Sequence, residues 1–189
     1  SPAWPDDFWE PLKFVPLGLE PGSYINFGGE DRERVEHFSE PLFGLTPRGT
    51  TTYDMHRLLL QGDLHIGDTF RSFVQFGNHL VTSSSLSPPT DVDRLDLQQG
   101  FADLKTAAGP DASLTLRGGR QEITFGSSRL VDVREGPNIR LSFDGGRAFY
   151  ESPDFRVDAF VTRPVDPERG YFDGHADPGQ AFWGLYGVM

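Results

Sequence analysis

The stretch LLLQGDLHIGDTFRSFVQFG, residues 58–77, indicates how the chain folds. Apolar side chains recur at every second position before its Gly67-Asp68 dipeptide, and again after it from Phe70. A period of two places each set of side chains on one side of a β-sheet. The dipeptide is short enough to join a hairpin. We therefore predict two antiparallel strands, Tyr53–Ile66 and Thr69–Val81.

Counting by twos divides the side chains of this hairpin into two sets. The set expected to face lipid contains Leu58, Leu60, Gly62, Leu64, Ile66, Phe70, Ser72, Val74 and Phe76. The set expected to face a lumen contains Arg57, Leu59, Gln61, Asp63, His65, Arg71, Phe73, Gln75 and Gly77. One apolar face and one polar face are typical of a membrane β-barrel.

Short alternating runs separated by Gly, Pro, Asp and Ser continue along the chain, without a helical period. They predict six further strands: Ser23–Phe38, Asp93–Thr106, Ser113–Phe125, Ile139–Tyr150, Phe155–Pro164 and Gln180–Val188. Most of these strands exceed the usual globular length of about 5–6 residues. They suit tilted membrane strands of about 9–11 residues with extensions beyond the bilayer.

The predicted connections alternate strictly between long and short. The short ones are Gly67-Asp68, Ala107–Ala112 and Glu151–Asp154, and the long ones are Ser39–Thr52, Thr82–Thr90, Gly126–Asn138 and Val165–Gly179. An up-and-down membrane barrel has tight turns on its periplasmic rim and long loops on its outer rim. We therefore expect an all-β, antiparallel, up-and-down transmembrane barrel, with all short turns on one rim.

The first strand departs from this pattern. Its lumen-facing set is Asn26, Gly28, Glu30, Arg32, Arg34 and Glu36, but its lipid-facing set continues from Ile25, Phe27 and Gly29 into Asp31 and Glu33. Charged groups on the lipid face are costly at mid-depth. Either these two acids lie near a membrane interface, or a β-bulge shifts the register.

Composition limits the function classes. The 189 residues carry a formal net charge of −11, which disfavours nucleic acid as a partner. Cysteine is absent, hydrophobic residues make up only 37%, and Phe (16) and Gly (22) are abundant. This composition fits a barrel that is wetted on one face, and it also fits a soluble β-sandwich that binds carbohydrate.

Residues 1–22 are expected to form an N-terminal periplasmic segment, and residues 23–189 are expected to form the strands of a partial barrel.

Two stretches carry a resemblance to a known family: RQE at residues 120–122 and REGPNIRLSFDGGR at residues 134–147. GGEDRER at 28–34 and DRLDLQQ at 93–99 agree with it. From about Tyr24 onward the chain resembles the alginate-export family of bacterial outer-membrane barrels. The resemblance implies a barrel of about eighteen strands that passes a polyuronate or another small anion through an arginine-lined lumen. Family members are more than twice as long, so we expect an N-terminal half that needs its remaining half, or a second copy, to form a pore.

Arginine is the side chain best suited to an anionic solute, because its planar guanidinium stays charged and binds carboxylates bidentately. The candidate lumen-lining residues are Arg32, Arg34, Arg71, Arg117, Arg120, Arg129, Arg134, Arg140 and Arg147. The alternative is that these arginines pair with Glu122, Glu135 and Asp144 in a network that stiffens the barrel. Similarly, the Gly126–Asn138 loop could either constrict the lumen or remain solvated outside it.

Other chemistry finds little support. The acidic stretches Asp91–Asp96 and Asp166–Asp177 lack the spacing of a calcium-binding loop, and the five histidines are scattered. Gly126-Ser127-Ser128 does not form a nucleophile elbow. We therefore expect no metal site, no cofactor and no catalytic residues. The expected function is passive, anion-selective passage of a sugar acid, polyuronate or organic acid across a bacterial outer membrane, with membrane lipid around the barrel.

Overall fold

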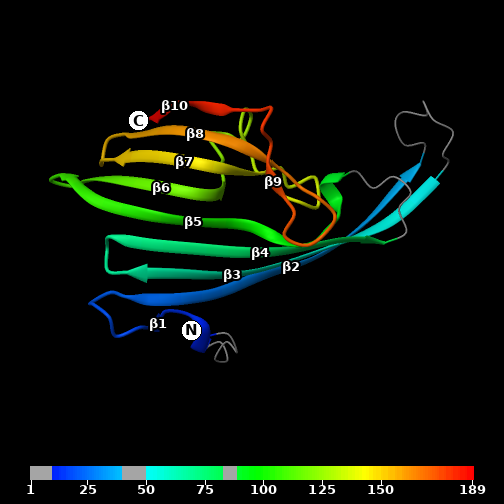
Figure 1. The fold of residues 1–189 in the computed structure, drawn as a ribbon, viewed down its shortest axis with the longest axis horizontal. Coiled ribbons are helices and arrows are strands. Elements are labelled where there is room, and N and C mark those ends of the chain that lie inside the picture. Colours follow the sequence, from blue (N-terminus) through cyan, green and yellow to red (C-terminus); the bar gives the residue numbers. More distant parts are fainter. Residues whose placement is uncertain (1–9, 40–49, 83–88) are drawn as a thin grey trace, which may run out of the picture.

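A computed structural model describes residues 10–39, 50–82 and 89–189, and these form one antiparallel sheet (Figure 1). Strands that are consecutive in the sequence pair with each other, apart from β9, which lies off the main path beside β8. The strands are β1 (Val15–Pro16), β2 (Tyr24–Ser39), β3 (Thr50–Ile66), β4 (Phe70–Thr82), β5 (Asp93–Gly109), β6 (Ala112–Glu122), β7 (Ser142–Glu151), β8 (Arg156–Asp166), β9 (His175–Ala176) and β10 (Phe182–Val188). Two single-turn 3₁₀ helices, Glu10–Leu12 and Pro89–Asp91, complete the described elements. Among these residues, no helix is long and apolar enough to cross a membrane.

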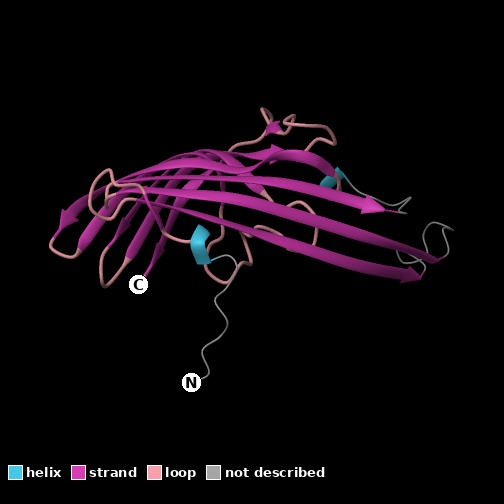
Figure 2. Cartoon of the chain, turned by 90° about the horizontal axis from the view of Figure 1, so that it is seen from below, coloured by secondary structure: helices cyan, strands magenta, loops and turns pink. Residues whose placement is uncertain are grey.

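The sheet is an open arch with a concave and a convex face (Figure 2). Its path runs from β1 at one edge to β10 at the other, so the described strands do not close on themselves. The up-and-down order confirms the predicted fold class, and it excludes the β-sandwich, which needs a second packed sheet.

The β3–β4, β5–β6 and β7–β8 turns, all short, lie together at one end of the arch (Figure 1). The β6–β7 and β8–β10 connections leave from the opposite end. Much of the other two long connections, residues 40–49 and 83–88, lies outside the described residues. The predicted separation of short and long connections is confirmed for the described part of the chain.

The two faces differ in chemistry as the period of two predicts. The convex face exposes large apolar side chains, among them Leu60, Val74, Phe76, Leu104, Leu116, Val161, Trp183 and Leu185. Their strand neighbours turn to the concave face, where many polar side chains are buried, including Arg57, Gln75, His79, Asp103, Thr115 and Asp158. Such a sheet resembles the wall of a barrel, with lipid outside and a polar lumen inside.

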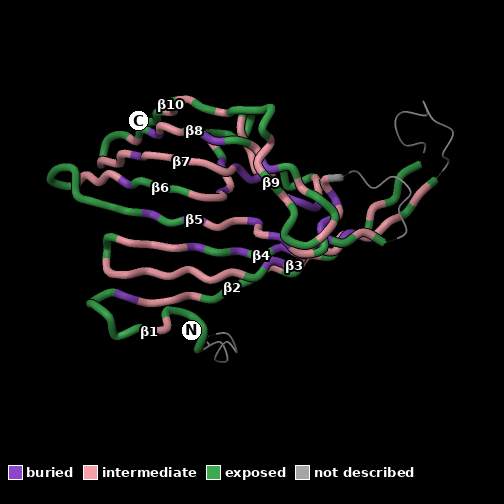
Figure 3. Tube along the Cα trace, in the orientation of Figure 1, coloured by how far each residue is buried: buried purple, intermediate pink, exposed green. Residues whose placement is uncertain are grey.

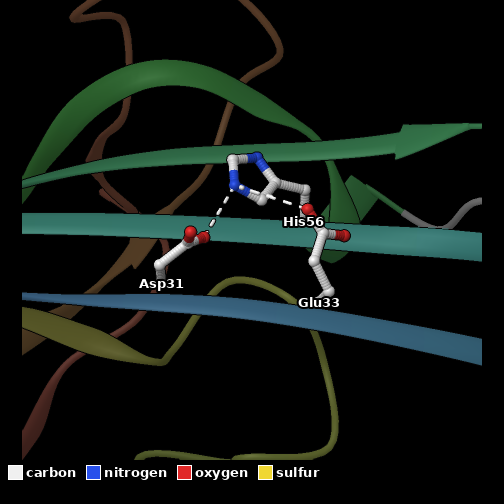
Figure 4. Close-up of side chains that lie close together, drawn as sticks. All are labelled: Asp31, Glu33 and His56. Carbon is white, nitrogen blue, oxygen red and sulfur yellow. Dashed lines mark hydrogen bonds and ion pairs between the residues drawn. The ribbon is translucent and has the colours of Figure 1, made fainter.

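The two acids of β2 that were expected on the lipid side, Asp31 and Glu33, lie on the convex face. Pairing between β2 and β3 runs without a shift from Tyr24–His65 to Ser39–Thr50, so the bulge interpretation is wrong for this strand. Asp31 and Glu33 lie beside His56 of β3, whose Nε2 is 2.9 Å from the Asp31 carboxylate and 3.7 Å from that of Glu33 (Figure 4). From this group toward the short β3–β4 turn, the apolar set of β3 extends from Leu58 to Ile66, which is about the length needed to cross a bilayer. The geometry favours the interface interpretation.

Register shifts occur elsewhere: one lies between Ala107 and Gly109 in the pairing of β5 with β6, and two lie in the pairing of β4 with β5. The register shifts between Gln75 and Phe76, and again between Gly77 and His79. Beyond Gly100, which pairs with Arg120, β5 no longer pairs with β6. A polar cavity of about 710 Å³ lies at this split. It is lined by residues of β5, β6 and β7 and of the β6–β7 and β8–β10 connections.

Two short strands were not predicted. β1 extends the edge of the sheet through Val15 and Pro16, within the expected N-terminal segment, and β9 pairs with the end of β8. Two-residue strands carry no periodicity, so counting by twos cannot detect them.

Candidate functional site

The connection between β6 and β7, residues 123–141, folds back across the concave side of the sheet (Figure 2). Its anchor is Asn138, a fully buried residue whose side-chain amide donates to the backbone carbonyls of His56 (2.9 Å), Leu80 (3.2 Å) and Asp91 (3.1 Å). The backbone N–H of Asn138 donates to the Asp91 carboxylate at 3.0 Å. The connection is thus fixed to strands that lie far away in the sequence, while its residues 126–130 and 134–136 stay exposed.

The chain around this anchor also bonds to itself. The Leu141 N–H donates to the Val133 carbonyl (2.7 Å), and the Ile139 N–H donates to the Thr90 carbonyl (2.9 Å). Ile139 is buried, which gives the connection an apolar contact as well. A long connection that keeps its own hydrogen bonds can hold charged side chains in fixed positions.

Glu135 of this connection is the centre of a group that we call the Glu135 cluster: Glu30, Arg32, Arg34, Arg57, Glu135 and Arg140. Its carboxylate accepts from Arg57 (2.8 Å), Arg140 (2.5 Å) and, less closely, Arg32 (3.4 Å). Glu30 of β2 accepts from Arg57 (2.7 Å) and Arg140 (3.0 Å). Two carboxylates therefore share two arginines, and they join β2, β3 and the connection.

Electrostatics favours this arrangement. Partial burial would raise the pKa of Glu135, but hydrogen bonds from Arg57 and Arg140 outweigh burial and hold that pKa below its usual value of 4.5. The pKa of Arg140 is raised, because Glu135 and nearby acids outweigh the opposing effect of burial. Arg57, only 1% exposed, depends on these partners, since an unpaired buried charge is costly.

Arg32 is held less firmly than the rest of the cluster. Its hydrogen bonds to Glu135 and to the Asn138 side chain measure 3.3–3.4 Å, and its Nε atom is buried without a hydrogen-bond partner. Beside it, Arg34 donates to the Gly136 carbonyl and lies 3.1 Å from the Glu36 carboxylate. Arg32 is therefore held by longer contacts than Arg57 and Arg140, whose ion pairs measure 2.5–3.0 Å.

Nearer the short turns lies a second group, which we call the arginine–phenylalanine row: Arg71, Arg117, Arg147, Arg156, Phe73, Phe101 and Phe149, with the acids Asp63, Asp103, Glu151 and Asp158. Arg117 binds Asp103 bidentately (2.7 and 2.7 Å), and Arg71 binds Asp63 bidentately (2.8 and 3.0 Å). Asp158 accepts from both Arg147 (2.7 Å) and Arg156 (2.8 Å).

The aromatic rings of the row lie against these guanidinium groups. Arg117 lies 3.7 Å from the centroid of Phe101, and Arg156 lies 4.8 Å from that of Phe149. Cation–π contacts and bidentate pairs both fix the orientation of an arginine. With four arginines and four acids, the row is electrically balanced and oriented by contacts within the sheet.

Arg120, also a candidate for the lumen, belongs instead to the convex side of the sheet. It shares the convex set of β6 with Leu116, and its guanidinium binds Asp144 bidentately (2.8 and 3.0 Å) and donates to the Gly174 carbonyl (3.1 Å). Gly174 belongs to the β8–β10 connection, which passes over the convex side of the arch (Figure 2). Counting by twos from Leu116 already places Arg120 in this outward set.

The other candidate arginines lie on the concave side. Arg32, Arg34 and Arg140 belong to the Glu135 cluster, and Arg71, Arg117 and Arg147 belong to the row. Arg129 and Arg134 are exposed on the β6–β7 connection, where they line the polar cavity. Figure 3 shows how buried segments gather where this connection meets the sheet.

Sequence reasoning left four important residues out of the candidate set. Arg57 is detectable from the period of two, and Arg156 follows the same rule two residues before Asp158. Glu135 was expected only as a possible partner of the arginines, and Asn138 acts through backbone groups of β3 and β4 that no local pattern reveals.

Comparison with known proteins agrees with this geometry. The family model described as "Alginate export" matches residues 23–188, so the chain belongs to the alginate-export family. No curated protein and no solved structure matches it. The family is one of outer-membrane transport proteins, and the match covers all the long strands described above.

Proposed function

We propose that this chain lines an outer-membrane channel that passes anionic sugar acids, polyuronates or organic acids down their concentration gradient. The concave face supplies the lumen wall, and the β6–β7 connection supplies its constriction. The convex face is apolar and suits contact with membrane lipid. The chemistry required is selective passage, for which oriented charges in a narrow aqueous space suffice.

Uneven pairing of the arginines carries this proposal. Arg71 and Arg117 of the row are held by bidentate carboxylates at 2.7–3.0 Å, whereas Arg32 makes contacts of only 3.3–3.4 Å. Arg129 and Arg134 are exposed on the β6–β7 connection, where they line the polar cavity. A passing carboxylate can exchange with such loosely held donors, and it can leave again because no single site binds it tightly.

The open edges of the sheet suggest how the lumen is completed. β10 pairs with β8 through Phe182–Val188, and its other edge has no strand partner among the described residues. In lipid, unpaired backbone groups of that edge would cost several kcal/mol each. We infer that further strands, from the same polypeptide or from a second copy, pair with β10 and with the β1–β2 edge to close the barrel.

Replacing Arg32 by Gln tests the proposal. Glu135 keeps Arg57 and Arg140, so this change removes a charge without isolating a carboxylate. A charge about 8 Å from a passing ion in water contributes about 0.5 kcal/mol, equivalent to about a twofold change in permeability ratio. We expect the anion-to-cation permeability ratio of the full-length protein in planar bilayers to fall by about that factor or more.

The matched control is Arg94→Gln, which removes the same charge from an exposed residue near the start of β5, outside the Glu135 cluster. The control should leave the reversal potential unchanged. Equal reversal potentials for the parent protein and the Arg32 variant, with both folded, would assign Arg32 to structural pairing and refute its role in selectivity.

A further inference from the structure

The two acidic stretches of the sequence meet in space at the split between β5 and β6. Asp93 and Asp96 lie at the start of β5, and Asp173 lies in the β8–β10 connection. One carboxylate oxygen from each of the three lies within 4.8 Å of the others. The bulges in β5 and the path of the connection create this group, which neither stretch could form alone.

A buried oxygen atom in this group lacks a partner. Asp93 is 3% exposed, and its Oδ1 has no hydrogen-bond partner in the structure. A carboxylate oxygen removed from water and left unpaired is strongly unfavourable. A ligand that supplies positive charge at this point would remove that cost.

The nearby guanidinium of Arg120 does not fill this role. Its Nη1 is 3.8 Å from the Asp96 carboxylate, while its bidentate contact is made with Asp144. Both Asp96 oxygens accept backbone N–H groups, from Leu97 (2.6 Å) and Gly174 (2.7 Å), which fixes the carboxylate without neutralising it. Three carboxylates therefore share this point with one guanidinium that is mainly engaged elsewhere.

We propose that Asp93, Asp96 and Asp173 form a binding site for one calcium ion. Calcium takes oxygen ligands at about 2.3–2.6 Å, so two oxygens on opposite sides of the ion lie up to about 5 Å apart, and the observed spacing fits. Water and backbone carbonyls complete such sites in proteins. The exposed Asp173 lets the ion enter from solvent.

The ion would secure the β8–β10 connection to the sheet. That connection already contacts β5 through the Phe172 N–H and the Leu95 carbonyl (2.9 Å), and Phe172 lies edge-on to Phe76 of β4. Coordination by Asp173 adds a link between this segment and the first residues of β5. Calcium binding therefore orders the outer rim beside the polar cavity.

Isothermal titration of the full-length, detergent-solubilised protein with CaCl₂, after treatment with EDTA, tests the site. We expect binding of one ion, and we expect Asp93→Asn and Asp173→Asn each to weaken it by at least about tenfold. The matched control is Asp68→Asn in the β3–β4 turn, an exposed acid at the opposite rim, which should leave the affinity within about twofold. Absence of calcium binding, or equal loss with Asp68→Asn, would overturn the proposal.

A second measurement covers the case in which a variant folds poorly. The Asp93→Asn change removes the buried, unpaired charge, so in EDTA this variant should unfold at a higher urea concentration than the parent protein. In CaCl₂ the order should reverse, because only the parent gains stability from the ion. The same order in both solutions, or the same response to NaCl at equal ionic strength, would overturn the proposal.

Discussion

Asn138→Ala is the most direct perturbation of the proposed constriction. The side-chain amide donates to three backbone carbonyls, and its oxygen accepts from Arg32 at 3.3 Å. Alanine removes these contacts at a fully buried position and leaves carbonyls of β3 and β4 without that donor. An isolated buried polar group costs about 1–3 kcal/mol, so we expect a loss of about 2–4 kcal/mol in the free energy of unfolding.

The assay has two readouts, because the connection contributes to both stability and pore width. Urea unfolding of the reconstituted protein measures the free energy, and single-channel conductance should rise as the freed connection leaves the lumen. The control is Asn78→Ala in β4, where the side-chain amide contacts one carbonyl, that of Arg94. A loss within about 0.5 kcal/mol, with unchanged conductance, would refute the anchoring role of Asn138.

Two further predictions concern the backbone and pH. Gly119→Ala should prevent assembly of the sheet on heat-shift gels, because Gly119 has φ +128° and a Cβ there would meet the β5 backbone. Gly118→Ala, where a Cβ meets nothing within 4 Å, should assemble normally, and equal behaviour of the two variants would contradict this reasoning. Because the folded pKa of Glu135 lies below 4.5, its pairing with Arg57 and Arg140 stabilises the protein fully above that pH and is lost as pH falls through the lowered pKa. The urea concentration at half-unfolding should therefore fall in the parent protein as pH drops through this pKa, and Glu135→Gln should show a smaller fall.

The long strands were predictable because each repeats one local rule. The residues of β3 and β4 largely alternate, and the observed bounds differ from the predicted ones by at most three residues. β6 is shorter than predicted: it stops at Glu122 instead of Phe125. There the chain leaves the ladder for the connection that Asn138 anchors, and that anchor lies on other strands.

The candidate site was predictable by residue type but not by partner. Arginines on the concave face follow from parity, as Arg71 and Arg117 show. Which of them are saturated depends on cross-strand register, such as the proximity of Asp103 to Arg117. Similarly, the meeting of Asp93 with Asp173 depends on bulges and on a connection that has no period of its own.

The distribution of pairing gives the arginines of one face two different roles. Removing Arg117 from the row would leave Asp103, which is 6% exposed, with only the distant Arg71 at 4.0 Å, so the expected effect is on folding. Removing Arg32 leaves Glu135 with two close partners, so the expected effect is on the passing ion. Replacing Arg32 should therefore change selectivity without loss of stability, whereas replacing Arg117 should reduce stability. An arginine of this face thus stiffens the wall where its carboxylate partners are close, and it can meet a solute where its contacts are long.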